Sequence, residues 1–580
     1  MTQNQIPDEL DWRLPQRLAY VVDRSLPYSN DAYAYRTHAI AQGMVANGFE
    51  VIVFSRPGHP WDLEEVGNSK YVPLDTTRDG VRYIFLPTFD DPDISRRERL
   101  RNVERTLFEA LSIFRPSAIM AVSNWENARP AANIARRLSI PFLYEARDLP
   151  QLSEGDHDQR NEEETPPDLN KRREAEIIRA SAGLFAATND VSADLIARGS
   201  APERTYVISN GAWSKPPQAP ILRRSQIGCE ARHLLGCFVS PSSPDDALNL
   251  VRLVAAIREN GVDVDALLIH HPEGSSDDGP AAAAPERNAI SNLVSDLRLG
   301  GHVHDAEDTS FDEIGGYYAL CDALMFWSDG VSNRSDSAAA LVPYHAASYG
   351  VPIFVSDHPH LKKFAAEIDA EVFDSSHLRG QAESLQEFLQ GDHAKFVDEL
   401  PAETYWEQRV APLVSMMTSI SNEEISRQRR QNAMGAPALE TSAPPFDLKA
   451  IPETMFAPEQ SLAIAAIGPC EELRDETPSF TSLTRTNIYS HLALAPPGLF
   501  IVDWAGLQRE KTPSAYDEWS ALWTISDMRL NRQMMDACRI AANRGWRLVV
   551  FGPVHGSEAP LFRTVSGLFD VQAQDEEEIA

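Results

Sequence analysis

The chain has 580 residues, of which 43% are hydrophobic, and its 53 basic and 85 acidic side chains give a net charge of −32 at pH 7. This length exceeds the roughly 250–300 residues at which a single hydrophobic core stops growing, so we expect several domains. The acidic excess argues against nucleic acid as a partner, because binding to phosphate backbones requires basic patches.

The cysteines and the N-terminus indicate the cellular compartment. The chain has five cysteines, and none forms a Cys-x-x-Cys pair, so we expect neither a disulfide framework nor a zinc site. The first residues lack a basic region followed by an apolar stretch, and no run of 18 apolar residues occurs. The sequence therefore predicts a cytoplasmic protein without a signal peptide or a transmembrane segment.

Residues 1–213 alternate between short apolar runs and helical segments, with turn residues between them. We expect strands at 17–23, 50–55, 81–86, 118–122, 141–145, 183–188 and 205–209, and helices at 33–47, 96–114, 127–138, 170–181 and 191–198. Repeated strand–helix–strand units favour a parallel sheet. This part of the chain is predicted to form one doubly wound, Rossmann-like α/β domain.

A second α/β series occupies residues 214–420 and follows Asn210-Gly211 and a proline-rich crossing. We expect strands at 233–239, 266–269, 323–326 and 351–356, and helices at 244–260, 286–298 and 312–320. Another helix precedes the turn at Gly350. The pattern predicts a second Rossmann-like domain.

The C-terminal part differs in character. Residues 421–460 are polar, proline-rich and weakly periodic, which predicts a linker. Residues 461–580 contain expected strands at 499–503 and 546–551 and a helix at 526–544. This is less than the five or six strands of a usual doubly wound sheet, so we expect a partial α/β domain. Either its strands pair with others, or the reading frame is incomplete.

Four segments in family order resemble family 4 glycosyltransferases of the GT-B fold. They are LPYSNDAYAYRTHAIAQGMVANGFEVIVFSRPGHPWD (26–62), IPFLYEARDLPQ (140–151), GLFAATNDVSADLIARGSAPERTYVISNGAW (183–213), and YYALCDALMFWSD with LVPYHAASYGVPIFVSD (317–329 and 341–357). The likeness covers roughly residues 17–375. It implies two Rossmann-like domains in tandem, the first for the acceptor and the second for the donor.

The resemblance also implies an activity. Such enzymes transfer a sugar from a nucleotide sugar to an acceptor with retention at the anomeric carbon, and they need no metal and no cofactor beyond the substrate. The acceptor side would be lined by His38, Glu145 and Arg147. The donor would contact Ser240, Ser242, Ser243, Asp336, Ser337 and His345.

The chain departs from the family pattern where positive charge should face the diphosphate. Asp31-Ala32 stands where two glycines are usual, and residues 240–249 contain two aspartates and no basic residue. Val342 replaces a lysine, and His345 replaces the second of two glutamates. Candidate replacement cations are Arg56, Arg334, Lys362 and Lys363.

Each candidate also has an interpretation without function. His38 would be a buried histidine, Glu145 and Arg147 a local ion pair, and His345 a tolerated substitution in a disused pocket. Asn210 is expected to make the hinge turn. His270 and His271 are not expected to bind a metal, because adjacent residues of a strand point to opposite faces.

The C-terminal segments GLFIVDWAG (498–506) and GWRLVVFGPVHGSEAPLFRTVSGLFDV (545–571) resemble CgeB-like glycosyltransferases over about 75 residues. The acidic residue that precedes Pro-Val-His in those proteins is absent here. This resemblance implies that the chain combines two glycosyltransferase units.

Three functional hypotheses follow. The first is a glycosyltransferase acting on a glycan or glycoconjugate acceptor in polysaccharide assembly. The second is a catalytically inactive glycosyltransferase-like scaffold, which would bind a partner glycosyltransferase or form a homo-oligomer. The third is a lectin-like sensor that keeps sugar contacts without turnover. Fold alone does not decide among them.

Overall fold

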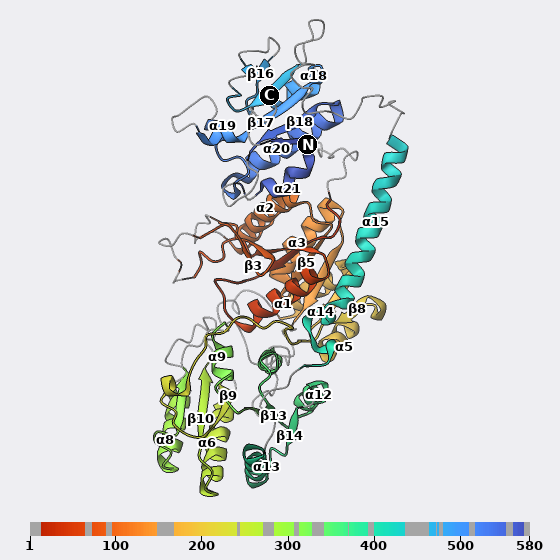
Figure 1. The fold of residues 1–580 in the computed structure, drawn as a ribbon. Helices are drawn as coiled ribbons and strands as arrows, with labels where there is room; N and C mark the ends of the chain where they lie inside the picture. Colours follow the sequence, from red (N-terminus) through yellow and green to blue (C-terminus); the bar gives the residue numbers. More distant parts are fainter. Residues whose placement is uncertain are drawn as a thin grey trace.

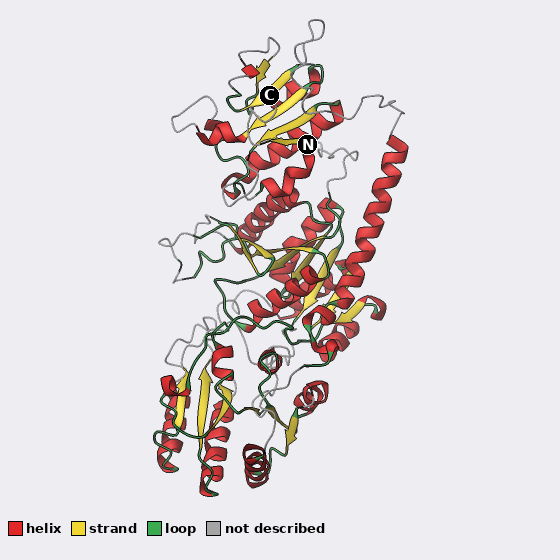
Figure 2. Cartoon of the chain, viewed as in Figure 1, coloured by secondary structure: helices red, strands yellow, loops and turns green. Residues whose placement is uncertain are grey.

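The computed structural model shows three sheets, parallel except for one edge strand, arranged along an elongated molecule with the N-terminal domain between the other two (Figure 1). Helices flank each sheet (Figure 2), as the predicted α/β class requires, and that class is confirmed. The structure describes residues 13–63, 66, 72–88, 95–147, 167–239, 244–270, 284–306, 312–327, 341–368, 370–391, 399–435, 463–470, 473–474, 480–509, 517–552, 559 and 561–573.

The N-terminal domain contains an eight-stranded sheet in the order β3-β4-β2-β1-β5-β6-β7-β8. Its strands are β1 (Arg17–Val22), β2 (Glu50–Ser55), β3 (Asp75–Arg78), β4 (Val81–Ile84), β5 (Ala118–Val122), β6 (Phe142–Ala146), β7 (Gly183–Ala186) and β8 (Thr205–Val207). Its helices are α1 (Ala32–Ala46), α2 (Arg96–Phe114), α3 (Trp125–Leu138), α4 (Pro167–Ala180) and α5 (Asn189–Ala197). The antiparallel edge strand β3 was not predicted, because its four residues are polar and carry no apolar run.

The second domain contains a six-stranded parallel sheet in the order β11-β10-β9-β12-β13-β14. Its strands are β9 (His233–Val239), β10 (Val264–His270), β11 (Val303–Ala306), β12 (Ala323–Phe326), β13 (Ile353–Ser356) and β14 (Glu371–Phe373). Its helices are α6 (Pro244–Glu259), α8 (Ala284–Asp296), α9 (Ile314–Tyr318), α11 (Leu341–Ala347), α12 (Pro359–Ile368) and α13 (Leu378–Gln390). The strand order reverses between β9 and β12, and ligands of open α/β sheets bind outside the carboxyl ends of the strands at such a point.

After the second domain the chain returns to the first. Helix α14 (Trp406–Arg409) and the start of α15 (Ala411–Gly435) pack on α1, and Trp406 and Leu413 join the core of the N-terminal domain. Two expectations change here. Residues 406–420 pack on the first domain although they lie inside the predicted second one. Residues 421–435, expected as linker, continue α15 because no proline or glycine interrupts the helix before Gly435.

The C-terminal domain has a five-stranded parallel sheet in the order β16-β15-β17-β18-β19. Its strands are β15 (Ile464–Ile467), β16 (Phe480–Ser482), β17 (Leu499–Asp503), β18 (Arg547–Phe551) and β19 (Val571–Ala573). Its helices include α18 (Ile488–Leu494), α19 (Trp504–Arg509), α20 (Met528–Arg544) and α21 (Phe562–Val565). The expectation of a two-strand fragment is therefore corrected. The strands β15, β16 and β19 were not predicted, because all three are short and β15 is half alanine.

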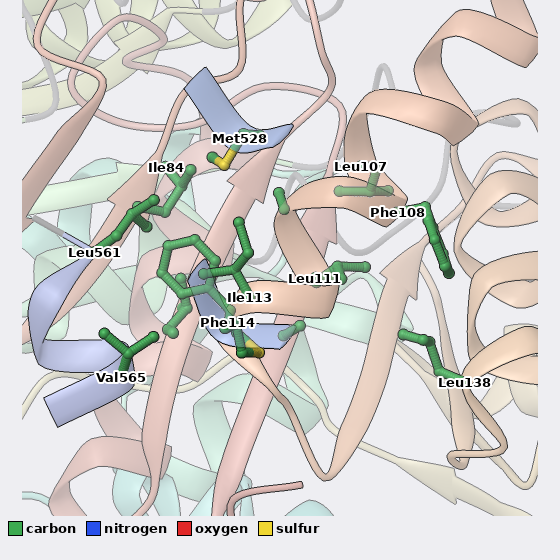
Figure 3. Packing of buried hydrophobic residues seen from close by; sticks show 14 of the residues in the cluster. Ile84, Leu107, Phe108, Leu111, Ile113, Phe114, Leu138, Met528, Leu561 and Val565 are labelled. Atoms are coloured by element: carbon green, nitrogen blue, oxygen red, sulfur yellow. The ribbon is translucent and has the colours of Figure 1, made fainter. Parts of the chain in front are cut away.

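This domain docks on the N-terminal domain through apolar side chains. Leu107, Leu111 and Phe114 of α2 and the adjoining turn belong to the same buried cluster as Met528 and Leu561 of the C-terminal domain (Figure 3). The guanidinium of Arg532 also lies 5.0 Å from the centre of the Phe108 ring. Among the described residues, no helix is both long and apolar enough to cross a membrane.

Candidate functional site

A buried charge network occupies the carboxyl end of β6 in the N-terminal domain. The side chain of Glu145 accepts hydrogen bonds from Arg36 (2.9 Å), from Arg147 (3.0 and 3.1 Å) and from the hydroxyl of Tyr20. Arg36 also donates to Asn210 Oδ1 and to the Ile208 carbonyl, both at 2.7 Å. The network therefore ties α1 to the end of the sheet and to the start of the hinge.

Burial and pairing decide the charge of Glu145. Burial alone would raise the pKa of its carboxyl, but Arg147 and Arg36 outweigh burial and lower that pKa to about 2. Burial and the adjacent Glu145 raise the pKa of Tyr20. The structure thus brings the predicted residues Glu145 and Arg147 together as an ion pair whose carboxylate oxygens are already engaged. Arg36 and Tyr20 were not predicted, because only the fold brings them there.

His38 lies on α1, 2% exposed, in the same domain. Its Nδ1 is 2.5 Å from the Tyr83 hydroxyl, and its Nε2 is 3.3 Å from a carboxylate oxygen of Asp79. Burial lowers the pKa of the imidazole, although Asp79 acts in the opposite direction. His38 is therefore held as a neutral ring near neutral pH.

A direct contact between the two tandem domains lies close to His38. Asp312 of the second domain accepts a hydrogen bond from the Tyr35 hydroxyl at 2.6 Å and pairs with Arg78 at 2.5 Å. Arg78 also lies 3.6 Å from Asp79, the partner of His38. No sequence pattern predicts this contact, because its residues belong to separate domains. We call Tyr35, Arg78 and Asp312 the interdomain contact.

Asp31 occupies a position where the resemblance implies a glycine. It caps α1 by accepting from the Ala34 backbone N–H at 2.9 Å, and it pairs with Arg24 at 2.6 Å. Arg56, a candidate cation, pairs with Asp23 at 2.9 Å in the same region. The negative charge of Asp31 is therefore compensated locally, and it contributes to the start of the helix.

His345 lies on α11 at the hinge and is completely buried. Its ring centre is 5.1 Å from that of Trp213, 5.8 Å from Tyr318 and 5.2 Å from Tyr349, all in edge-on arrangements. The Trp213 backbone N–H donates to Ser348 Oγ at 2.8 Å and fixes the hinge against α11. We call Trp213, Tyr318 and Tyr349 the aromatic box.

Several predicted donor residues lie outside the described residues. These are Ser240, Ser242, Ser243, Asp336 and Ser337, together with the candidate cation Arg334 and with His271. Lys362 and Lys363 are exposed on α12, and His270 lies 3.0 Å from Asp305. The structure therefore brings Glu145 and Arg147 together, places His38 elsewhere on the same domain beside Tyr83 and Asp79, and places His345 at the hinge.

Two parallel α/β domains joined by a hinge, with the chain returning to the first domain, form the GT-B architecture. Residues 32–211 match the family model of the glycosyl transferase 4-like domain. The N-terminal domain is therefore similar to such domains, and the predicted resemblance is confirmed for this region. The CgeB-like resemblance stays a prediction.

Solved structures that are similar to this chain include the following three. Sucrose-phosphate synthase from Thermosynechococcus elongatus is 16% identical, with a TM-score of 0.45 over 73% of this chain and 100% of that chain. Anabaena HepE in complex with UDP and glucose is 13% identical, with a TM-score of 0.44 over 72% and 100%. A UDP-forming trehalose-phosphate synthase from Burkholderia xenovorans is 12% identical, with a TM-score of 0.43 over 72% and 99%. A comparison with curated proteins finds no match.

Proposed function

We propose that the protein transfers a sugar from a nucleotide sugar to a glycan or glycoconjugate acceptor, with retention and without a metal ion in the transfer step. The observation that carries this proposal is the glycosyl transferase 4-like match at residues 32–211, in a domain followed by a second parallel-sheet domain. Such a pair of sheets offers two carboxyl edges, one for the acceptor and one for the donor.

The donor site is proposed at the carboxyl ends of β9 and β12. In the chain, residues 240–243 follow β9 directly, and residues 328–340, which include Asp336, follow shortly after β12. Backbone N–H groups near Ser240 to Ser243 would face the diphosphate, whose charge grows as the sugar leaves. Asp336 and Ser337 would accept hydrogen bonds from sugar or ribose hydroxyls.

His345 contributes to this proposal through the hinge. Because its ring is enclosed by the aromatic box, a contact with the donor requires the hinge to move and uncover it. Hinge movements between domains are common in enzymes, and in many of them the movement closes the site and excludes water from a reactive intermediate.

The acceptor side is proposed near His38. It lies one helical turn from Tyr35, which reaches the second domain through Asp312. Glu145 and Arg147 would act as positioning residues that hold α1, because their charges are engaged with each other. No side chain needs to act as a covalent nucleophile.

Calorimetric titration of the full chain with nucleoside diphosphates and nucleotide sugars tests the proposal. We expect one nucleotide family to bind, and the Asp336→Ala, His345→Ala double variant to bind it more weakly. Asp374→Ala, an exposed change at the end of β14, is the matched control. Absence of binding to every compound would reject the transferase.

A catalytically inactive scaffold is the second candidate. The complete burial of His345 favours it, because a buried ring offers no sugar contact in the observed state. Donor binding without transfer or hydrolysis over long incubations, with a range of glycan acceptors, would support a sensor or scaffold over an enzyme.

A further inference from the structure

A buried cysteine, aspartate and histidine meet in the second domain. Cys229 precedes β9, Asp265 is the second residue of β10, and His304 is the second residue of β11. The thiol sulfur, one carboxylate oxygen and one imidazole nitrogen all lie within 4.8 Å of one another, and all three residues are buried. The group lies toward the amino ends of the strands, whereas the proposed donor site is at their carboxyl ends.

Sheet register and a tight turn bring these side chains together. In the parallel pairing of β10 with β11, Leu267 lies opposite His304. Asp265 is two residues before Leu267, so Asp265 and His304 face the same side of the sheet. Gly228, with φ of 73°, makes the left-handed turn that delivers Cys229, whose backbone N–H donates to the Arg224 carbonyl at 3.0 Å.

The two oxygens of Asp265 have different surroundings. Oδ1 is 2.9 Å from His302 Nδ1 and accepts from Arg258 at 3.1 Å. Oδ2 is 2.9 Å from His304 Nε2. Arg258 and His302 therefore fix the carboxylate, and its other oxygen is directed toward His304. Outer partners of this kind orient the ligands of protein metal sites.

The ligand atoms at this group, a thiol sulfur, a carboxylate oxygen and an imidazole nitrogen, indicate which metal it would bind. Thiolate and imidazole are ligands typical of zinc, whereas magnesium and calcium prefer sites built from oxygen alone. A thiolate and a carboxylate together balance the charge of a divalent ion. Three protein ligands leave one position of a tetrahedral zinc site for water.

We propose that Cys229, Asp265 and His304 bind a zinc ion that fastens the segment before β9 to β10 and β11. The site is separate from the proposed sugar transfer, and its role is to stabilise the second domain. The expectation of no zinc site rested on the absence of Cys-x-x-Cys pairs and took no account of residues that only the fold brings together.

Cobalt substitution tests the site in the full chain. After dialysis against a chelator, we expect one equivalent of Co²⁺ to give the near-ultraviolet absorption of a cobalt–thiolate bond. Cys229→Ser should remove this band. Cys237→Ser, in β9, is the matched control, because Cys237 is also buried and its thiol donates to the Asp246 carbonyl 3.9 Å away, outside the proposed ligand set. A cobalt–thiolate band that survives in Cys229→Ser, or is absent from the wild type, would overturn the proposal.

A second measurement does not depend on the folding of Cys229→Ser. We expect Zn²⁺ to raise the melting temperature of the metal-free wild type and to bind His302→Gln about 10- to 100-fold more weakly, as expected for loss of an outer partner. His270→Gln, at the other end of β10, should bind zinc as the wild type does. Equal zinc affinity in His302→Gln and the wild type would place the zinc elsewhere, and no rise in the melting temperature of the wild type would show a hydrogen-bonded cluster without metal. The zinc experiments do not measure nucleotide binding. A negative result for zinc therefore leaves the proposed sugar transfer unaffected, and a negative result for nucleotide binding leaves the zinc site unaffected.

Discussion

The charge network of the N-terminal domain and the aromatic box at the hinge bury polar side chains in different ways. Glu145 is surrounded by two guanidinium groups and a hydroxyl, so its charge is kept and compensated. His345 is surrounded by three aromatic rings. The first arrangement depends on every partner being present, since a charge left alone in the interior is costly. The second arrangement depends on how the aromatic rings pack around the imidazole.

The charge network and the aromatic box also support different parts of the proposed site. The charge network holds α1, which carries His38 and Tyr35, so it maintains the proposed acceptor side. The aromatic box joins α11 to Trp213 at the crossing between domains, so it adjusts to the position of the second domain. Changes in the first region should act mainly on stability, whereas changes in the second should act on both stability and donor binding.

Loss of one network cation should have the largest effect. Arg36→Met removes one of the two guanidinium groups that pair with Glu145 and the donor to Asn210 Oδ1, and we expect a loss of about 3–5 kcal/mol in the unfolding free energy of the N-terminal domain. Hydrogen exchange of amides in β1 and β6 at increasing urea measures this domain separately. Arg24→Met, which removes the half-exposed partner of Asp31, should cost at most about 1 kcal/mol. Equal losses of unfolding free energy in Arg36→Met and Arg24→Met would mean that burial of an ion pair does not determine its contribution.

The same network should produce an acid transition. The pKa of Glu145 is lowered from 4.5 to about 2 in the folded state, so its contribution is complete above pH 4.5 and is lost as the pH falls toward 2. The contribution is on the order of 3 kcal/mol. Urea unfolding between pH 2 and pH 6 measures this contribution. The free energy of unfolding should change less steeply with pH in Glu145→Gln than in the wild type. An identical pH dependence in both proteins would contradict the pairing.

Much of the architecture could be predicted from short apolar runs alone. Strands such as Glu50–Ser55 and Leu499–Asp503 are bounded by turn residues and have the predicted limits. The edge strands β3 and β16 could not be found in this way, because a strand of three or four mostly polar residues is held by its neighbours in the sheet and carries no apolar run of its own.

The candidate site was less accessible to sequence analysis. Glu145 and Arg147 are two residues apart, so an ion pair between them could be anticipated. Arg36 is 109 positions from Glu145 and 174 from Asn210, and only the fold joins them. The same limit applies to Asp312 and Tyr35, 277 positions apart. Charge compensation at Asp31 was missed because Arg24 lies across a loop of unknown shape.

Two substitutions of His345 should separate its role in packing from a contact with the donor. His345→Ala leaves a cavity in the aromatic box and should cost about 2–4 kcal/mol in the second domain. His345→Phe keeps the ring and should cost less than about 1.5 kcal/mol. Hydrogen exchange in β13 measures both. If His345 contacts the donor, His345→Phe should also weaken nucleotide binding. Unchanged binding in the stable Phe variant would restrict His345 to a packing role.

The interdomain contact should give the smallest effect, because Arg78 and Asp312 are each about one-third exposed. Asp312→Ala removes the partner of Arg78 and Tyr35, and we expect the closed arrangement to lose about 0.5–1 kcal/mol. Since 1.4 kcal/mol changes a population ratio tenfold, this loss is roughly a two- to fivefold shift toward open forms. Single-molecule energy transfer between dyes on α2 and α13 measures the shift, with Arg379→Ala, an exposed change within the second domain, as the control. A wild-type distribution in Asp312→Ala would show that the hinge and the aromatic box alone set the relative position of the two domains.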